Sequence, residues 1–359
     1  MRIVTVIGAR PQFIKASMLS SHLSTKGIEE TLIHTGQHFD RNMSDIFFSE
    51  LGLQAPQILL DINGDTNTRQ TARVMMALEG QLRQNRPSAI LVYGDTNATL
   101  AGAMVGAQLN IPVIHVEAGL RSYDRRMPEE INRVLTDNLS SLLFCPTQTA
   151  VKNLEREGIQ EGVHDVGDIM YDAVLHFAGL AKEESTILER LQFEEKKYIL
   201  ATVHRNFNTD DPARLKAILR AFKQCEETIV FPMHPRTKKM IAQFELNDYL
   251  QSRNMVLTEP LGYLDMIRLQ AGAKVIVTDS GGVQKEAYFN GVPSVILREN
   301  TEWVELVELG WGKLVSNDSE SIVKAIQSAQ AGESKENPYG KGNTGISITD
   351  HIHAYLSNL

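Results

Sequence analysis

Short apolar runs alternate with longer amphipathic segments along most of this chain. The runs are rich in Val and Ile and are bounded by Gly, Asp or His, a pattern typical of parallel strands with helices between them. In the first half, the pattern predicts strands over residues 3–8, 31–35, 89–94, 112–117, 142–146 and 164–167. In the second half, it predicts strands over residues 198–203, 228–233, 256–261, 274–279 and 293–298.

This alternation predicts an α/β protein with two doubly wound, Rossmann-like domains. The length of 359 residues supports two domains, because a domain usually has about 100–200 residues. We expect an N-terminal domain over 1–169 and a C-terminal domain over 170–359, with the polar stretch AKEESTILER leading into the second series of strands. Residues 347–359 are predicted to form a short helix, and packing of this helix against the first domain is left open.

Composition narrows the classes of function. A net charge of −8 argues against a nucleic-acid surface, which needs clustered cations. No apolar run is long enough to span a bilayer, and the first apolar stretch, of about six residues, is followed by Arg and Pro as in a strand rather than a signal peptide. Cys145 and Cys225 lack the spacing of a metal site or a disulfide framework, so both are expected in the core of a cytoplasmic protein.

Two turns have the composition of anion sites. In GARPQFIK, Gly8 ends the first predicted strand, and Arg10 and Lys15 lie at the start of the next helix, where an anion is favoured. The motif is not GxGxxG, so it does not indicate a dinucleotide. The alternative is a helix start with a surface salt bridge.

The second turn, TDSGGVQKE, follows the apolar run KVIVT and opens a helix. Ser280, Gly281 and Gly282 leave backbone N–H groups and a hydroxyl accessible to an oxygen anion. Glu286 lies further into the helix, where a carboxylate can hold a ribose diol. The alternative is an ordinary N-cap followed by a solvated glutamate.

Three acidic residues lie near strand ends in the first half: Asp95 in LVYGDTNAT, Glu117 in VIHVEAGLR and Glu129 in RMPEEINR. Paired carboxylates suit proton abstraction on one face of a substrate and proton return on the other. For Asp95 alone, a helix N-cap is the commoner role. Because parallel strands collect ligands at their carboxyl ends, we expect the site in a cleft between the domains.

Histidines end strands in both halves. His204 and Arg205 follow one strand of the second half, and His234 in VFPMHPRTK follows another. A single histidine at such a position is more often a capped structural residue, but two of them indicate a site. His38 in HTGQHFD is weaker evidence. No HExxH, nucleophile elbow or P-loop motif is present.

The chain resembles the non-hydrolysing UDP-N-acetylglucosamine 2-epimerases. The resemblance extends from Arg2 to about Tyr339 through an ordered set of motifs: GARPQFIK, TGQH, GDTNAT, HVEAGLR, PEEINR, TVHRNF, PMHP, EPL, TDSGGVQKEA and NPYG. It implies the two-domain GT-B fold, a homodimer and no cofactor or metal. It also implies an isomerase that supplies precursors for cell-surface polysaccharide, including lipopolysaccharide.

The resemblance also implies roles for individual residues. The family's acid and base carboxylates are matched by Asp95, Glu117 and Glu129, and residues needed for activity by His204 and Arg133. Its UDP site is matched by Arg10, Ser280, Gly281, Gly282 and Glu286, with Lys15, Arg205 and His234 near the phosphates or the sugar. Family members are understood to eliminate UDP, forming a 2-acetamidoglucal, and then to add UDP back.

Departures from the usual sequence pattern of the family bear on the substrate. RENTEWVE stands where ERPE is common, which resembles a branch that includes UDP-2,3-diacetamido-2,3-dideoxyglucuronate 2-epimerases. That substrate would demand altered contacts around Thr301, Glu302 and Trp303. Gln37 and His38 match part of an allosteric UDP-N-acetylglucosamine pocket, but Asp40 stands where an amide is expected. A hydrolysing epimerase, a GT-B glycosyltransferase and a non-catalytic nucleotide-sugar sensor are the alternatives.

Overall fold

A computed structural model describes residues 1–36, 48, 50–316, 318–333 and 337–359. Its contacts divide the chain into two compact units, Met1–Ala173 with Asn337–Leu359, and Val174–Glu336. This division and the predicted boundary at residue 170 both fall within helix α7, Ile169–Glu184. None of the helices in the described residues has the length and apolar character of a membrane span.

The first unit contains a seven-stranded parallel sheet in the order β3-β2-β1-β4-β5-β6-β7. Its strands are β1 Arg2–Ile7, β2 Glu29–His34, β3 Ile58–Leu59, β4 Ala89–Tyr93, β5 Val113–Val116, β6 Leu142–Cys145 and β7 Val163–Asp165. Its helices are α1 Arg10–Thr25, α3 Asn67–Gln84, α4 Asn97–Gln108, α5 Pro128–Leu139, α6 Gln148–Arg156 and α16 Thr344–Ser357. All five residues of β4 are buried, as expected for a parallel strand that is covered on both faces.

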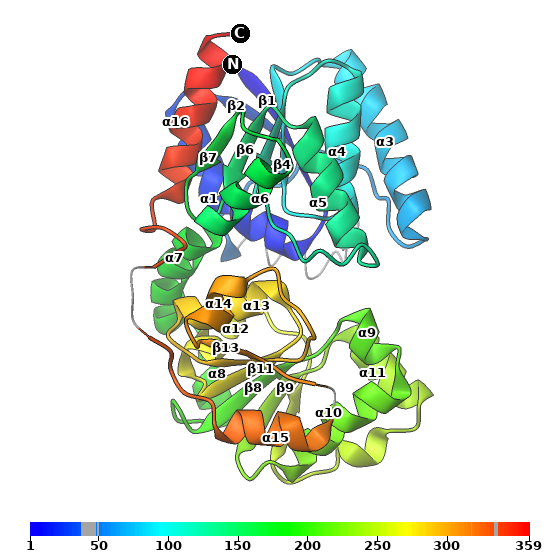
Figure 1. Cartoon of the computed structure of the whole chain (residues 1–359), viewed down its shortest axis with the longest axis vertical. Coiled ribbons are helices and arrows are strands. Elements are labelled where there is room, and N and C mark those ends of the chain that lie inside the picture. The colour runs from blue at the N-terminus through cyan, green and yellow to red at the C-terminus, as the bar shows by residue number, and fades with distance from the viewer. Residues whose placement is uncertain (37–47, 49, 317, 334–336) are drawn as a thin grey trace. The chain divides into compact units, whose positions relative to one another are not determined.

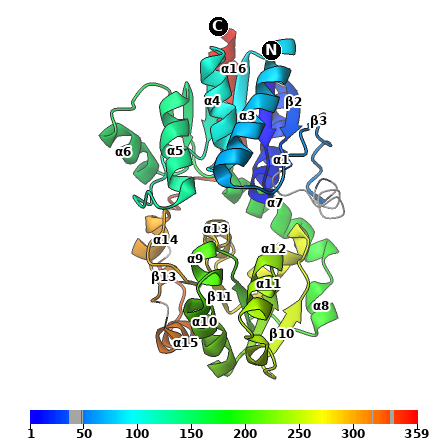
Figure 2. The ribbon, with the colours of Figure 1, turned by 90° about the vertical axis from the view of Figure 1, so that its right-hand side faces the viewer.

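Helices cover both faces of this sheet. Figure 1 shows α16 on one side of the sheet and α3 and α4 on the other, and α3, α4 and α5 pack side by side (Figure 2). Helix α4 approaches the sheet through glycine: a Cβ at Gly106 would lie 2.7 Å from Val113 Cγ2. The small residues of α4 therefore set how closely this helix packs on the strands.

The C-terminal helix α16 belongs to the first unit. It packs on α1, the Gly345 N–H donates to Asp172 Oδ2 over 2.8 Å, and Lys26 Nζ lies 2.7 Å from Asp350 Oδ1. The predicted helix over 347–359 is confirmed, with a start at Thr344. The segment Asn337–Leu359 was expected in the C-terminal domain, 170–359, but it belongs to the first unit. The reason is that the apolar face of α16 is buried against that unit.

The second unit contains a six-stranded parallel sheet in the order β10-β9-β8-β11-β12-β13. Its strands are β8 Tyr198–Thr202, β9 Thr228–Pro232, β10 Met255–Thr258, β11 Val275–Thr278, β12 Ser294–Ile296 and β13 Gly312–Leu314. Its helices are α8 Ile187–Leu191, α9 Asn206–Thr209, α10 Pro212–Gln224, α11 Pro235–Gln243, the 3-10 helix Asn247–Tyr249, α12 Tyr263–Gly272, α13 Gly281–Phe289, α14 Val304–Glu308 and α15 Ser319–Gln327.

Strand β8 shows why this sheet is covered on both faces. Ile199 and Ala201 belong to one hydrophobic cluster, and Tyr198 and Leu200 belong to another. Because successive side chains of a strand point to opposite faces, these clusters lie on the two sides of the sheet. The strand therefore has an apolar run rather than an alternating pattern.

All eleven predicted strands are confirmed, with boundaries that shift by no more than three residues. The strands β3 and β13 were not predicted. β3 has two residues and β13 has three, Gly312, Lys313 and Leu314. Both are edge strands, and such short segments carry too few residues for a hydrophobic period to emerge.

Candidate active-site residues

Residues that follow β1, β4 and β5 come together at the carboxyl edge of the first sheet. Lys15 Nζ, from the second turn of α1, lies 2.7 Å from Glu117 Oε1, and these side chains are only 6% and 10% exposed. Gly94, directly after β4, is the neighbour of both: a Cβ there would lie 3.3 Å from Glu117 Oε1 and 3.5 Å from Lys15 Nζ. The anion-site motif and one strand-end carboxylate thus form a single buried ion pair.

Glu117 has an unusual backbone conformation. Its φ is +73°, in the left-handed region that costs a residue with a side chain on the order of 1–3 kcal/mol. The N–H groups of Glu117 and Ala118 both donate to the Phe144 carbonyl, over 3.1 and 3.0 Å. The turn therefore keeps its backbone polar groups satisfied while it directs the carboxylate to Lys15.

Asp95 is held by Arg133. Arg133 Nη2 donates to Asp95 Oδ2 over 2.5 Å, and Asn132 Nδ2 donates to the Asp95 carbonyl over 2.9 Å. The N-cap of α4 is Thr96, whose hydroxyl accepts from Thr99 N. The N-cap alternative for Asp95 is therefore wrong. Side chains of helix α5 hold this residue in place instead.

Of the two adjacent glutamates of PEEINR, Glu130 is the buried one. Glu130 accepts hydrogen bonds from Ser122 N, Ser122 Oγ and Tyr123 N at 2.9 to 3.0 Å, and Arg133 Nη1 donates to it over 3.0 Å. Glu129 is half-buried in the first turn of α5. From the sequence, Glu129 was selected and Glu130 was missed. On a helix, residues three and four positions before Arg133 both lie next to Arg133, so spacing alone does not distinguish the two glutamates.

Gln12 was also missed. Its Oε1 accepts from Gly8 N and Ala9 N over 2.7 and 3.1 Å, and its Nε2 donates to the Tyr93 carbonyl over 2.8 Å. The side chain therefore joins the turn after β1 to the turn after β4. Arg10 is the first residue of α1 in this turn.

In the second unit, the buried carboxylate of Asp279 organises the turn after β8. Oδ2 accepts from Arg205 N over 3.0 Å and from Asn208 Nδ2 over 3.1 Å, and both oxygens accept from His204 N at 3.1 Å. Asp279 precedes Ser280 in the TDSGG motif, which offered a sequence signal for it. Sequence reasoning missed the residue because it considered the glycine-rich turn only as an anion site.

The two strand-end histidines are neighbours. The ring centroids of His204 and His234 are 5.3 Å apart. Burial lowers the pKa of His204 below its usual 6.5, although the Asp279 carboxylate, 3.4 Å from Nδ1, acts in the opposite direction. His234 is the N-cap of α11, and its Nδ1 accepts from Arg236 N over 3.2 Å, so it has the capping role that was the alternative for it.

The glycine-rich turn packs against the segment after β12. Ser280 is the N-cap of α13, with its Oγ 3.5 Å from Val283 N. A Cβ at Gly281 would lie 2.5 Å from Glu302 Oε1, whereas one at Gly282 would meet only Ser280 Oγ at 3.9 Å. Glu302 is held by Arg298 Nη2 over 2.8 Å, so the carboxylate next to Gly281 is itself a fixed, buried group.

Further residues of this segment contact α13. Thr301 Oγ1 donates to Gln284 Oε1 over 2.8 Å, and Lys285 Nζ lies 3.8 Å from the centroid of the Trp303 ring.

The solvated alternative for Glu286 is wrong. Glu286 is 6% exposed and accepts from Gln270 Nε2 over 2.7 Å. Burial raises the pKa of Glu286, although the hydrogen bond from Gln270 and the charge of Lys285 oppose the shift.

Other expectations fall outside these two edges. Gln37, His38 and Asp40 lie outside the described residues. Cys145 and Cys225 are buried and free, as expected. Within the residues that the structure describes, no group of three or more His, Cys, Asp or Glu side chains is arranged to hold a metal ion.

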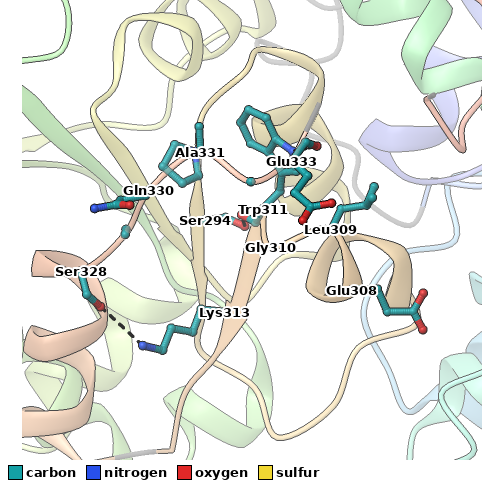
Figure 3. Close-up of a pocket in the computed structure, with 13 residues that line it drawn as sticks. Ser294, Glu308, Leu309, Gly310, Trp311, Lys313, Ser328, Gln330, Ala331 and Glu333 are labelled. Atoms are coloured by element: carbon teal, nitrogen blue, oxygen red, sulfur yellow. Dashed lines mark hydrogen bonds between the residues drawn. The ribbon is translucent and has the colours of Figure 1, made fainter. Parts of the chain in front are cut away.

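The second unit has a surface pocket of about 460 Å³ (Figure 3), and none of the candidate residues lines it. It is lined by Ser294 and Lys313, near the beginnings of β12 and β13, and by Trp311 and the segment after α15. Ser280 and Arg298 instead follow the ends of β11 and β12. The pocket is therefore at the opposite edge of the sheet from these polar residues.

Comparison with known proteins identifies the family. The model of the family described as UDP-N-acetylglucosamine 2-epimerase matches residues 21–353. The chain belongs to the UDP-N-acetylglucosamine 2-epimerase family. It is 49% identical to a UDP-N-acetylglucosamine 2-epimerase homolog of Methanococcus maripaludis, over 98% of this chain and 99% of that protein.

Two further family members bear on the fold and the substrate. A UDP-2,3-diacetamido-2,3-dideoxy-D-glucuronate 2-epimerase of Pseudomonas aeruginosa is 43% identical, over 98% of this chain and 99% of that protein. The crystal structure of the Methanocaldococcus jannaschii UDP-GlcNAc 2-epimerase with UDP-GlcNAc and UDP matches with a TM-score of 0.93 and 41% identity, over 99% and 100% of the chains. The expected epimerase family and GT-B fold are thereby confirmed.

Alanine substitution at Gly281 tests how closely the glycine-rich turn packs against Glu302. Gly281→Ala places a methyl group within 2.5 Å of a carboxylate that Arg298 holds, so we expect it to destabilise the protein by about 1–3 kcal/mol. Gly282→Ala is the matched control, because its Cβ has space. Thermal unfolding of both variants followed by circular dichroism measures the difference, and equal melting temperatures would contradict this packing.

Proposed function

We propose that this protein interconverts UDP-N-acetylglucosamine and UDP-N-acetylmannosamine by inverting carbon 2 of the sugar. The observation that carries the proposal is the arrangement of Asp95 and Glu117, which follow neighbouring strands. Each carboxylate lies within 2.7 Å of a cationic side chain. Two fixed carboxylates at one sheet edge supply the acid–base pair that an epimerisation requires.

The chemistry explains why cations accompany these carboxylates. The hydrogen on carbon 2 is not next to a carbonyl, so enolisation cannot acidify it. In the proposed route, a base removes this proton while the bond between carbon 1 and the phosphate oxygen breaks, giving UDP and a 2-acetamidoglucal. UDP then adds back to carbon 1, and carbon 2 receives a proton on the opposite face.

Asp95, Glu117 and Glu129 are proposed as the acid–base groups of the two proton transfers. Arg133 holds Asp95 for this role. His204 is the further residue proposed to be required, and its lowered pKa favours a neutral imidazole near pH 7. A neutral imidazole can accept a proton through one ring nitrogen and donate a hydrogen bond to the leaving group through the other.

The remaining site residues are proposed to bind UDP and the sugar. The first turn of α13 offers backbone N–H groups and a helix N-terminus to a diphosphate, and the buried carboxylate of Glu286 suits a ribose diol. The proposed binding residues are Arg10, Lys15, Arg205, His234, Ser280, Gly281, Gly282, Glu286, Thr301 and Glu302. The positive residues among them would stabilise the departing diphosphate. Gln37 and His38 remain a proposed allosteric pocket, from their sequence match alone.

UDP-2,3-diacetamido-2,3-dideoxyglucuronate is the second candidate substrate. The segment RENTEWVE, which differs from the usual family sequence, places Glu302 and Trp303 directly against Gly281. The Pseudomonas aeruginosa relative named for that substrate is 43% identical, and the Methanocaldococcus jannaschii relative named for UDP-N-acetylglucosamine is 42% identical. Overall similarity therefore gives no preference, and both sugars belong in the assay.

We also propose a cytoplasmic homodimer that serves cell-surface polysaccharide synthesis, such as that of lipopolysaccharide. Ile131 and Leu135, one turn apart on α5, are 45% and 43% exposed, an apolar strip of the kind that a second copy covers. The buried free thiols of Cys145 and Cys225 suit a reducing compartment.

The proposed reaction predicts solvent isotope incorporation. Incubation with UDP-N-acetylglucosamine, or separately with the diacetamido uronate, in deuterated water should give an epimer with deuterium at carbon 2, because the returning proton comes from a group that exchanges with solvent. NMR and mass spectrometry of the products measure it. Free N-acetylmannosamine would instead indicate a hydrolysing epimerase, and transfer of the sugar to an added acceptor would indicate a glycosyltransferase.

The acid–base assignment predicts the behaviour of three variants. Asp95→Asn, Glu117→Gln and Glu129→Gln should each reduce turnover by at least about 100-fold, because each removes a proton-transfer group. UDP should still bind, as calorimetry would measure. Glu155→Gln, on the exposed side of α6, is a control that should keep wild-type turnover. Undiminished turnover in all three variants would refute the assignment.

A further inference from the structure

His115 is a buried histidine at the start of the HVEAGLR motif, and the proposed mechanism gives it no role. It lies in β5, two residues before Glu117, with no exposed surface. Its Nδ1 lies 2.7 Å from Asp137 Oδ1 on α5, and its Nε2 lies 2.8 Å from the carbonyl oxygen of Gly94. A carbonyl oxygen can only accept, so Nε2 must carry the hydrogen of the second contact.

The other ring nitrogen faces an ionised carboxylate. Asp137 Oδ2 accepts from Arg121 Nη1 over 2.7 Å and from Gly119 N over 3.2 Å, and such donors stabilise a carboxylate. Burial alone would raise the pKa of Asp137, but the interactions with His115 and Arg121 lower it. Asp137 therefore holds the Nδ1 side of the ring, which leaves Nε2 directed at the Gly94 carbonyl.

Arg121 links this pair to a second carboxylate. Arg121 Nη2 also pairs with Glu157 Oε2 over 2.6 Å, so His115, Asp137, Arg121 and Glu157 form one connected group. The side chains of His115 and Asp137 are fully buried, whereas that of Glu157 is 30% exposed.

We propose that His115 is a positioning residue that fixes the turn carrying Asp95 through the hydrogen bond from Nε2 to Gly94. This inference rests on the proposed function, in which Asp95 is an acid–base group. The Gly94 N–H donates to the Val116 carbonyl over 2.9 Å, so His115 holds the other end of the same residue. Gly94 has a φ of +63°, which leaves the turn little intrinsic preference for one conformation.

The consequence for the site follows from the position of Gly94. Gly94 separates Asp95 from the Lys15–Glu117 pair, and Arg133 and Asn132 hold Asp95 from α5. Asp137, the partner of His115, lies on α5 as well. One helix thus holds the turn both through Asp95 and, by way of His115, through Gly94.

Two neutral substitutions distinguish positioning from packing. The amide nitrogen of His115→Gln reaches the place of Nε2 and can still donate to Gly94, whereas that of His115→Asn reaches only the place of Nδ1. We expect His115→Asn to lower kcat by between about 10- and 100-fold with little change in KM, as for a misplaced catalytic group. His115→Gln should recover most of kcat. Equal kcat values for the two variants would overturn the proposal.

Glu157→Gln is the matched control for general damage to the buried charges. It weakens the Arg121 end of the group, which has no contact with Gly94, so we expect a lower melting temperature with kcat unchanged. A loss of kcat as large as that of His115→Asn would mean that loosening of the charged group, rather than the bond to Gly94, accounts for the effect, and would overturn the proposal.

A spectroscopic measurement tests the hydrogen bond independently of activity. In a ¹⁵N-histidine-labelled wild-type protein, the His115 signals, assigned by their absence from His115→Gln, should show a proton on Nε2. A ring without a proton on Nε2 would overturn the proposal even if the variants fail to fold. If the wild type epimerised neither sugar nucleotide, the proposed function would fail while this signal still reported on the turn.

Discussion

The buried ion pair between Lys15 and Glu117 is the interaction on which the first sheet edge depends. A carboxylate that is 10% exposed is stable at neutral pH only with a close positive partner or several hydrogen-bond donors. Lys15 supplies that partner from the helix that follows β1, and the left-handed backbone of Glu117 directs the carboxylate to it. The motif after β1 and the motif after β5 are therefore parts of one structure.

In the second unit, hydrogen bonds rather than a lysine stabilise a buried carboxylate. Asp279 is fully buried and accepts from two backbone N–H groups and the Asn208 amide, so the turn after β8 is fixed by the residue that follows β11. The strand order reverses between β1 and β4 in the first unit and between β8 and β11 in the second. At these points a polar side chain joins the two strand ends: Gln12 in the first unit and Asp279 in the second. Ligands of open parallel sheets bind at such points.

The sequence predicted the fold well because its dominant signal was local. Each central strand is an apolar run, and a strand that is buried on both faces needs such a run. The short edge strands β3 and β13 lack it, and the place of α16 could not be predicted because a helical pattern shows which face is buried but not the partner.

The candidate residues were predicted less completely than the strands. Strand-end polar residues such as Asp95, Glu117 and Asp279 stand out after an apolar run, although Asp279 was passed over in favour of the glycines that follow it. Gln12 and Glu130 do not stand out, because their function lies in contacts outside their own motifs, such as those with Tyr93 and Ser122. The φ of Glu117 had no sequence signal at all, since glutamate does not favour that region.

Epimerisation by elimination requires that the bond between carbon 1 and the phosphate oxygen breaks in every turnover. The most direct test uses a UDP-sugar substrate with ¹⁸O in that bridging position and follows the label by ³¹P NMR during turnover. If UDP leaves and adds back, the label should move from the bridge into the non-bridging positions of the β-phosphate, because the released phosphate can rotate. Epimerised product that keeps all of its label in the bridge would contradict elimination and the site roles derived from it.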